Sequence, residues 1–308
     1  MILCITPNPA LDRTLIVPNL ALGNVHRAQQ LIVAAGGKGL NVARAAQTLG
    51  RKSLCMGFAG GHSGHLLADL AQSEGLNSSW TWTDSETRTC TILVSQNGDA
   101  TEIDEPGLPI SDADWARLRG EVQKQLSPFA LICVSGSLPP NSSVDDLHEL
   151  LRMLMDAGKQ VWVDTSGTSL DAVLTYPGIC IKVNGNEMSK SLGFEVKDIP
   201  SAQRALTLLI ERGLSACAIT LGAAGALLAT KAGRWYAQGP QVRAISSVGS
   251  GDSFLGGLLS ARDADKDWPE ALLDAVAAGT ANTLSAGGGQ FTVQEFRRIR
   301  EQARIQTW

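Results

Sequence analysis

The sequence has no basic run and no apolar run long enough to span a bilayer. Its first residues, Met1–Pro7, lack a basic flank and reach proline after too few apolar residues for a signal peptide. The 308 residues carry a formal net charge of −4, which argues against a nucleic-acid or membrane partner. We therefore expect a globular cytoplasmic protein that acts on small molecules.

Several sequence motifs that mark common sites are also missing. The six cysteines form no CxxC pair, and Cys133, Cys180 and Cys217 lie within apolar runs, which is typical of buried, reduced thiols and argues against zinc. There is no GxGxxG after the first strand and no GxxxxGK[ST], so neither a dinucleotide fingerprint nor a Walker A loop is present. The absence of HExxH and GxSxG argues against a metalloprotease or an α/β-hydrolase.

Short apolar runs alternate with helical patterns along most of the chain. This alternation predicts one α/β domain over residues 1–308, with a mostly parallel sheet and helices on both faces. The expected strands are Ile2–Thr6, Ser53–Phe58, Leu131–Val134, Gln160–Val163, Ile179–Val183 and Ala216–Leu221. The expected helices are Gly39–Leu49, Gly64–Ser73, Val144–Asp156, Ala202–Arg212, Ser253–Ala261, Pro269–Ser285 and Thr292–Arg304.

Two segments interrupt the alternation and are typical of β-hairpins. The first pairs Thr14–Val17 with Ala28–Val33, and the second pairs Thr89–Ser95 with Ala100–Ile103 across the turn signal Asn97-Gly98. Because these strands have no helices of their own, we expect segments at about 12–33 and 86–105 to form a small β-sheet lid. Such a lid would cover the carboxyl ends of the main strands, where open α/β sheets bind ligands.

The stretch Ser246–Gly257 is typical of a loop that enters an apolar helix. Gly249 and Gly251 allow a tight turn that brings backbone N–H groups close to an anion, and the positive end of the helix dipole points at the same place. Asp252 is a candidate general base there, and the dipole should keep it ionised at neutral pH. A plain N-cap explains an aspartate at a helix start equally well.

A second glycine-rich junction, Gly36-Gly37-Lys38-Gly39, stands between a predicted strand and a predicted helix, with Asn41 one turn into that helix. The glycines let a ligand touch the backbone, and the lysine supplies a mobile charge for a phosphate. A tight turn with a solvated lysine is the structural alternative.

The two junctions resemble the two signatures of the ribokinase or phosphofructokinase B family of carbohydrate kinases. Gly36–Ala43 is similar to the first signature, and Ser246–Leu259 is similar to the second. Intermediate motifs extend the resemblance over nearly the whole chain: Asn8–Asp12, Glu86–Arg88, Ser135–Pro139, Lys182–Glu187 and Thr220–Gly225. The resemblance implies a ribokinase-like three-layer sandwich with a β lid. It also implies ATP and Mg²⁺ as cofactors, and it allows a monovalent cation.

The resemblance further implies roles for single residues. Asp252 would be the base, while backbone N–H groups of Gly249, Ser250 and Gly251 would hold the transferring phosphoryl group. Glu187 would order Mg²⁺ through water, although a helix start also explains its spacing from Asn184. The implied ATP-binding residues are Lys182, Asn184, Thr220, Gly222, Gly225, Asn282 and Ser285.

On the sugar side, the resemblance implies that Asp12 accepts hydrogen bonds from two hydroxyls. Arg27, Lys38 and Arg88 would neutralise a phosphate already on the sugar, and the remaining implied substrate residues are Gly37, Asn41 and Ser137. The most similar branch is the phosphofructokinase and tagatose-6-phosphate kinase group. The expected substrate is therefore a ketohexose monophosphate: tagatose 6-phosphate, fructose 6-phosphate or fructose 1-phosphate, converted to the bisphosphate.

Two alternatives remain open. A kinase of a neutral sugar or nucleoside would not need the basic set, and a non-catalytic nucleotide- or sugar-phosphate-binding regulator would not need Asp252. We also expect a homodimer through the lid, because the alternating apolar residues Cys90, Ile92 and Val94 leave one sheet face that needs cover.

Overall fold

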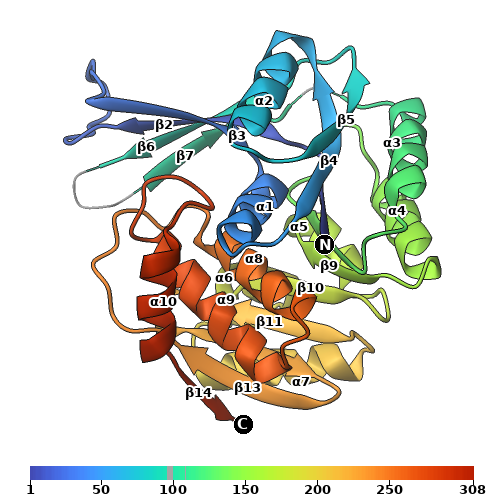
Figure 1. Cartoon of the computed structure of the whole chain (residues 1–308), viewed down its shortest axis with the longest axis vertical. Coiled ribbons are helices and arrows are strands. Elements are labelled where there is room, and N and C mark those ends of the chain that lie inside the picture. The colour runs from blue at the N-terminus through green and yellow to red at the C-terminus, as the bar shows by residue number, and fades with distance from the viewer. Residues whose placement is uncertain (96–99, 108) are drawn as a thin grey trace.

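The computed structural model describes residues 1–95, 100–107 and 109–308. These residues form a ten-stranded sheet and a separate four-stranded sheet (Figure 1). In spatial order the large sheet contains β14 (Arg304–Thr307), β13 (Gly233–Gln238), β12 (Ala226–Thr230), β11 (Ala216–Thr220), β10 (Cys180–Asn184), β9 (Gln160–Asp164), β8 (Leu131–Ser135), β1 (Ile2–Thr6), β4 (Ser53–Gly60) and β5 (Ser78–Thr83).

The strands from β11 through β5 are parallel, whereas β12, β13 and β14 extend the sheet as antiparallel strands. The prediction of a mostly parallel α/β sheet is therefore confirmed. The carboxyl ends of neighbouring parallel strands meet at one edge, so Asp164 at the end of β9 and Asn184 at the end of β10 reach the same region.

Helices cover both faces of the large sheet. One face packs against α1 (Lys38–Thr48), α2 (Gly61–Ser73), α8 (Ser250–Asp263) and α9 (Trp268–Asn282). The other face packs against α3 (Asp112–Gln125), α4 (Val144–Asp156), α5 (Gly167–Val173), α6 (Gly185–Leu192) and α7 (Ile199–Glu211). Side chains alternate between the two faces along each strand: on β1, Ile2 and Cys4 face the first set of helices, while Leu3 and Ile5 face the second.

Helix α8 is held tightly between two neighbouring helices. A Cβ on Gly256 would lie 2.7 Å from the Cβ of Ala45 in α1, and a Cβ on Gly257 would lie 2.8 Å from the carbonyl oxygen of Asp274 in α9. The glycine pair therefore allows a close approach that any larger residue would prevent. This packing fixes the position of the α8 N-terminus, which carries the candidate base.

The four-stranded sheet is the expected lid, with strand order β3 (Gln30–Gly36), β2 (Ala10–Ile16), β6 (Arg88–Val94) and β7 (Ala100–Asp104). It projects from one side of the molecule (Figure 1). Both predicted hairpin pairings are present, since β2 with β3 and β6 with β7 are antiparallel. The predicted Asn97-Gly98 turn lies outside the described residues. Sequence did not predict that β2 and β6 pair in parallel and so join the two hairpins.

Some elements differ from the sequence-based expectation. The strand β5 and the helices α3, α5 and α6 were not predicted, because β5 is a polar edge strand and the three helices have short or weak apolar patterns. The antiparallel strands β12 and β13 were not predicted either. The last helix, α10, covers Val293–Gln302 and ends before Arg304, which begins β14; the prediction of a helix as far as Arg304 is wrong. Among the described residues no helix is long and apolar enough to cross a membrane.

Candidate active site

The candidate base, Asp252, lies in the first turn of α8 and is only 6% exposed. The side-chain amide of Asn41 donates a hydrogen bond to its Oδ2 at 2.8 Å. Burial, followed by the negative charge of Asp164, raises the pKa of Asp252, although Lys182, Lys38 and Asn41 act in the opposite direction. The helix dipole acts in the same direction as these lysines, whereas burial and Asp164 oppose it. A raised pKa brings a carboxylate closer to the range that suits a general base.

The loop before α8 is shaped to receive an anion. Gly249 is the N-cap residue, with φ of 71°, and no side chain caps the helix. A Cβ at this position would lie 2.4 Å from the Cα of Gly288, so the left-handed turn and the close contact both require glycine. The uncapped first turn presents N–H groups and the positive end of the dipole to a ligand.

Two lysines converge on one buried carboxylate beside this turn. Asp164 is fully buried, and its two oxygens accept hydrogen bonds from Lys38 Nζ at 2.8 Å and from Lys182 Nζ at 2.6 Å. A Cβ on Gly251 would lie 2.6 Å from Lys182 Nζ, so this ammonium lies over the first turn of α8. The site therefore combines an uncapped helix N-terminus with two cations.

The charges in this cluster stabilise one another. Burial alone would lower the pKa of Lys38, but the carboxylates of Asp164 and Glu187 raise it well above its usual range. Burial alone would raise the pKa of Asp164, but Lys182 and Lys38 lower it below its usual value. Lys38 is therefore an ammonium ion at neutral pH. The side chain of Lys38 is 34% exposed and that of Lys182 is 5% exposed, so Lys38 has the greater freedom to move toward a ligand.

Sequence reasoning assigned no role to Asp164. Its only local signal is an aspartate at the carboxyl end of an apolar strand-like run, Val161-Trp162-Val163. The register of the sheet explains the position of Asp164. Ser135 on β8 pairs with Asp164 on β9, and Ile181 on β10 pairs with Val163, so Lys182 lies at the level of Asp164 on the next strand. The strand order brings Asp164 next to Lys182, and the packing of α1 beside β1 and β8 brings Lys38 to the same carboxylate.

The predicted pair Asn184 and Glu187 forms the capping box of α6. The Asn184 side chain accepts from the Glu187 backbone N–H, and Glu187 Oε2 accepts from the Asn184 backbone N–H, each at 2.9 Å. The structural explanation of the spacing therefore holds. Glu187 also presents its other oxygen, Oε1, 3.6 Å from Lys38 Nζ, so this carboxylate faces the lysine cluster.

A cavity of about 280 Å³ opens beside the α8 N-terminus. Three predicted nucleotide-binding residues, Thr220, Gly222 and Gly225, line it. Ser250 and Gly251 form its wall toward the anion-binding turn. Its other side is formed largely by apolar and hydroxyl side chains: Val242, Ala244, Phe254, Val276, Thr280 and Thr283. An elongated ligand with an apolar end and an anionic end fits this distribution.

The predicted ATP residues Lys182, Asn184, Asn282 and Ser285 are not among the described residues that line this cavity. Asn282 is fully buried, donates to the carbonyl of Val248 at 2.7 Å, and accepts from Ser253 Oγ and the Gln290 backbone N–H, each at 3.0 Å. Its observed contacts fasten the loop that precedes Gly249.

On the lid side, Asp12 of β2 packs so closely on Gly36 that a Cβ there would lie 2.1 Å from Asp12 Oδ1. Burial raises the pKa of Asp12 to about 7, with smaller contributions from neighbouring charges. Gly37, which the resemblance also assigned to substrate binding, is the N-cap of α1. The Asp12 carboxylate and the α1 N-terminus therefore meet at the junction between lid and main sheet.

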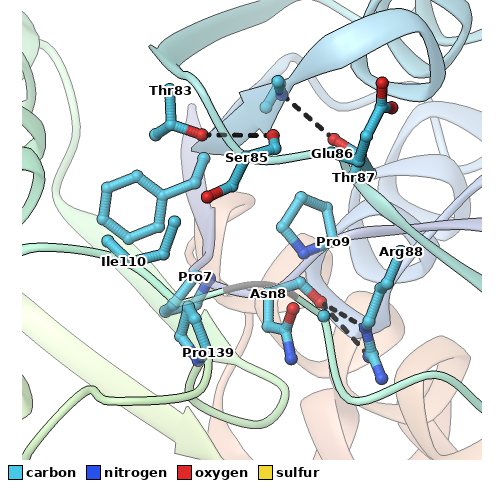
Figure 2. A pocket seen from close by; sticks show the side chains of 14 residues that line it. Pro7, Asn8, Pro9, Thr83, Ser85, Glu86, Thr87, Arg88, Ile110 and Pro139 are labelled. Carbon is cyan, nitrogen blue, oxygen red and sulfur yellow. Dashed lines mark hydrogen bonds between the residues drawn. The ribbon is translucent and has the colours of Figure 1, made fainter.

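The predicted phosphate ligands Arg27 and Arg88 lie outside the lysine cluster. Arg88 lines a small hollow of about 20 Å³. Its guanidinium donates to the Asn8 carbonyl at 3.2 and 3.3 Å, and Figure 2 shows these two contacts as dashed lines. Another Arg88 nitrogen donates to the Glu105 carbonyl at 3.0 Å.

Arg27 is exposed in the β2–β3 connection and makes no hydrogen bond or ion pair with the described residues. The predicted Ser137 is exposed, and its hydroxyl accepts from Asn8 Nδ2 at 3.1 Å.

We expect Asp12→Asn to make the ligand-free protein more resistant to heat at pH 8 but not at pH 4. The folded pKa of about 7 exceeds the ordinary value of 3.8, so ionising Asp12 costs folding stability as pH rises from 4 to 7. Because the Asp12 side chain is partly exposed, solvent screening reduces this cost, and we expect about 1–2 kcal/mol, or roughly 1–3 °C in Tm for a chain of this length at pH 8. Calorimetry at both pH values measures this difference, and an equal Tm shift at pH 4 and pH 8 would contradict it.

Transfer of a phosphoryl group from a nucleotide to a hydroxyl is the chemistry that this geometry suits, because that reaction needs a positioned base and neutralisation of charge more than covalent catalysis. The model of the pfkB family carbohydrate kinases matches residues 6–294, and the chain belongs to that family.

Named relatives agree with this family. The chain is 35% identical over 265 residues to 1-phosphofructokinase of Haloferax volcanii, covering 85% of this chain and 84% of the relative. It is 31% identical over 255 residues to 1-phosphofructokinase of Escherichia coli, covering 83% and 82%. Among solved structures, phosphofructokinase-2 of Escherichia coli in complex with substrates and products superimposes with a TM-score of 0.89, at 26% identity and 98% coverage of each chain. The same enzyme has also been solved in complex with potassium and as a tetrameric inhibited form. The expected ribokinase-like α/β fold is confirmed.

Proposed function

We propose that this protein is an ATP-dependent kinase that phosphorylates a ketohexose monophosphate to the bisphosphate. The observation that carries the proposal is the position of Asp252 at an uncapped helix N-terminus. Two lysines lie beside this terminus, and a cavity large enough for a nucleoside opens next to it. The two relatives described above, at 35% and 31% identity, are named 1-phosphofructokinases, so fructose 1-phosphate is the first candidate among the three sugars.

In the proposed reaction Asp252 takes the proton of the attacking hydroxyl. The N–H groups of the first turn of α8, together with Lys182 and Lys38, stabilise the charge of the transferring phosphoryl group. The lid would exclude water while Asp12 holds sugar hydroxyls, because an open site would let water accept the phosphoryl group.

Mg²⁺ is proposed as the metal cofactor alongside ATP, and a monovalent cation is an optional further cofactor. The described residues contain no cluster of three or more His, Cys, Asp or Glu side chains that could hold a metal. Glu187 and Asn184 could hold Mg²⁺ through water, which suits an ion that keeps several waters and binds largely through substrate phosphates. When bound, Mg²⁺ would neutralise phosphate charge.

A coupled ADP-release assay tests the proposal. Fructose 1-phosphate, fructose 6-phosphate and tagatose 6-phosphate are compared at equal concentrations, with ribose and adenosine as neutral acceptors. At least one sugar phosphate should give a kcat/KM about 10²-fold or more above both neutral acceptors, because the phosphate supplies charge-assisted hydrogen bonds. Turnover confined to ribose or adenosine would refute the proposal.

A neutral-sugar kinase is the second candidate, because one observation favours it. Arg88 donates its N–H groups to the carbonyls of Asn8 and Glu105, and Arg27 lies in an exposed loop. Neither guanidinium is therefore positioned to bind a sugar phosphate in this structure. The ribose and adenosine arms of the assay decide between the two candidates.

We also propose a homodimer formed through the lid. Leu22 and Val25, in the β2–β3 connection, are 99% and 91% exposed, and Leu31 and Ile103 on the lid strands are also exposed. Cys90, Ile92 and Val94, from which the sequence predicted the dimer, are already buried within one chain, so that premise was wrong. The proposal rests instead on the exposed apolar group of the lid, which a second lid related by a two-fold axis can cover.

We expect Val25→Asp to convert the dimer into a monomer at micromolar concentration, because a charge would replace an apolar contact in the buried interface. Sedimentation velocity measures the change. Val293→Asp is the matched control, since Val293 is 38% exposed at the start of α10, outside the lid. A wild-type protein that sediments as a monomer, or equal dissociation in both variants, would contradict the lid interface.

A further inference from the structure

Arg44 is buried in α1, one turn after Asn41, with an exposure of 8%. All five N–H donors of its guanidinium have acceptors. Two bonds reach Glu74 Oε2, from Nε at 2.9 Å and from Nη2 at 2.6 Å. The other three reach the carbonyl of Ala35 at 2.7 Å, the side-chain oxygen of Asn41 at 2.7 Å and the carbonyl of Gly288 at 2.8 Å.

The bond to Asn41 determines which way its amide points. A side-chain amide has one accepting end and one donating end, and it can reverse when neither end is specified. Arg44 can only donate, so it fixes the Asn41 oxygen on its own side. The NH₂ group must then point the other way, where it donates to Asp252 Oδ2 at 2.8 Å. The orientation of the Asp252 carboxylate therefore depends on Arg44 through one intermediate side chain.

The opposite edge of the guanidinium contacts the base of the lid. Ala35, near the end of β3, is bonded from both sides: its carbonyl accepts from Arg44 and its N–H donates to Glu74 Oε1 at 3.1 Å. The next residue, Gly36, packs against the Asp12 carboxylate. One side chain thus joins the lid strand to the helix that orients the base.

The contact with Gly288 adds a third connection. Gly288 packs against Gly249, the N-cap of the helix that carries Asp252, and the neighbouring Gly289 packs against the backbone of Asn41. Arg44 therefore touches, directly or through one residue, the lid, the base and the loop around the anion-binding turn. A purely structural ion pair with Glu74 would need only two of the five bonds.

We propose that Arg44 is a positioning residue for phosphoryl transfer: it fixes the Asn41 amide, and through it the Asp252 carboxylate, in register with the lid strand β3. The inference rests on the proposed role of Asp252 as base. It assigns Arg44 no contact with substrate. Its loss should therefore lower kcat while leaving nucleotide affinity nearly unchanged.

The test uses Arg44→Lys, which keeps the charge but cannot make five directed bonds. We expect kcat to fall about 10- to 100-fold while KM for ATP changes less than about threefold, as for a loss felt only in the transition state. Arg300→Lys is the matched control, because Arg300 also pairs with two carboxylates, Asp274 and Glu270. None of these three residues lines the cavity or contacts the lysine cluster. It should lower Tm and leave kcat unchanged. Equal loss of kcat in both variants would overturn the proposal.

A double-mutant cycle with Asn41→Ala separates positioning from general destabilisation. If Arg44 acts through Asn41, the double variant has the kcat of Asn41→Ala alone within about threefold. Fold losses that multiply would overturn the relay. Should Arg44→Lys fail to fold, Asn41→Asp tests the second link, since it keeps a partner for Arg44 and replaces the donor to Asp252 by an acceptor. Its kcat should fall at least 10-fold, and wild-type kcat would overturn the proposal.

The wild-type reaction keeps the two hypotheses distinguishable. Every variant is assayed with whichever acceptor the wild-type enzyme phosphorylates. A wild-type enzyme that is active only on a neutral sugar refutes the proposed substrate, while the Arg44 comparison proceeds with that sugar. An active wild-type enzyme with equally active Arg44→Lys and Asn41→Asp variants refutes only the role of Arg44.

Discussion

Asp252→Asn should reduce kcat by roughly 10²–10⁴-fold, because the amide keeps the size of the side chain but cannot take a proton from the attacking hydroxyl. KM for ATP should stay within about threefold of wild type, since the cavity beside α8 is lined by other residues such as Thr220 and Gly225. Steady-state ADP release with saturating acceptor measures kcat, and calorimetric titration measures nucleotide binding.

Asp274→Asn is a suitable control for this loss. Asp274 is also a buried aspartate, 5% exposed, and it accepts hydrogen bonds from Lys266 and Arg300, each at 2.7 Å. It lies in α9 and stabilises the contact with α10, so its variant should lose stability and keep turnover. If Asp252→Asn turns over at the wild-type rate, Asp252 is not the base.

Local chemistry explains why the region of the base could be predicted from sequence. The features that make Asp252 a candidate, two glycines before an apolar helix and a carboxylate in its first turn, all lie within Ser246–Gly257. Similarly, the hairpins of the lid were predictable because each strand pairs with its neighbour in sequence. The register of these strands then placed Asp12 beside the junction with α1.

The surroundings of the base could not be predicted in the same way, because they come from distant segments. Asp164 meets Lys182 because β9 and β10 are adjacent in the sheet, and it meets Lys38 because α1 packs beside β1 and β8. Arg44 stands in a helix among alanines, and its burial becomes intelligible only once Glu74 and Gly288 are seen to receive its N–H groups. Side chains that orient a catalytic group through an intermediate leave no local pattern in the sequence.

The direction of the Asp252 pKa shift shows the same limit. A helix N-terminus alone favours an ionised carboxylate, and this is what the sequence predicts. The fold, however, buries Asp252 and brings Asp164 close to it, and both effects raise its pKa. A single sequence motif cannot report how much solvent the surrounding helices exclude.

Lys38→Met should lower kcat about 10²–10³-fold, a larger effect than any change in the KM of the sugar phosphate. Sequence reasoning grouped Lys38 with Arg27 and Arg88 as a ligand of the phosphate already on the sugar. In the structure its ammonium lies 2.8 Å from Asp164, on the same carboxylate as Lys182, and Lys182 covers the first turn of α8. A cation at that position stabilises charge that develops on the transferring group, and such an interaction acts on turnover.

Arg88→Leu provides the contrast. Arg88 lies at the start of β6, away from the lysine cluster, so it can contact only the phosphate already on the sugar. Loss of that contact should raise the KM of the sugar phosphate by roughly ten- to a hundredfold. Its kcat should change less than about threefold. Lys231→Met, an exposed lysine in the β12–β13 turn, is the control for loss of one positive charge and should leave both constants unchanged.

Lys38→Met should remain folded, because Lys182 still pairs with the buried Asp164 and no uncompensated charge is left. A measured loss of kcat therefore reports on the reaction and not on the stability of the sheet. If Lys38→Met instead keeps the parent kcat and raises only the KM of the sugar phosphate, Lys38 binds the phosphate already on the sugar, as the sequence suggested. If neither Lys38→Met nor Arg88→Leu changes kcat or that KM, the basic side chains do not bind a sugar phosphate, and the neutral-sugar kinase becomes the better assignment.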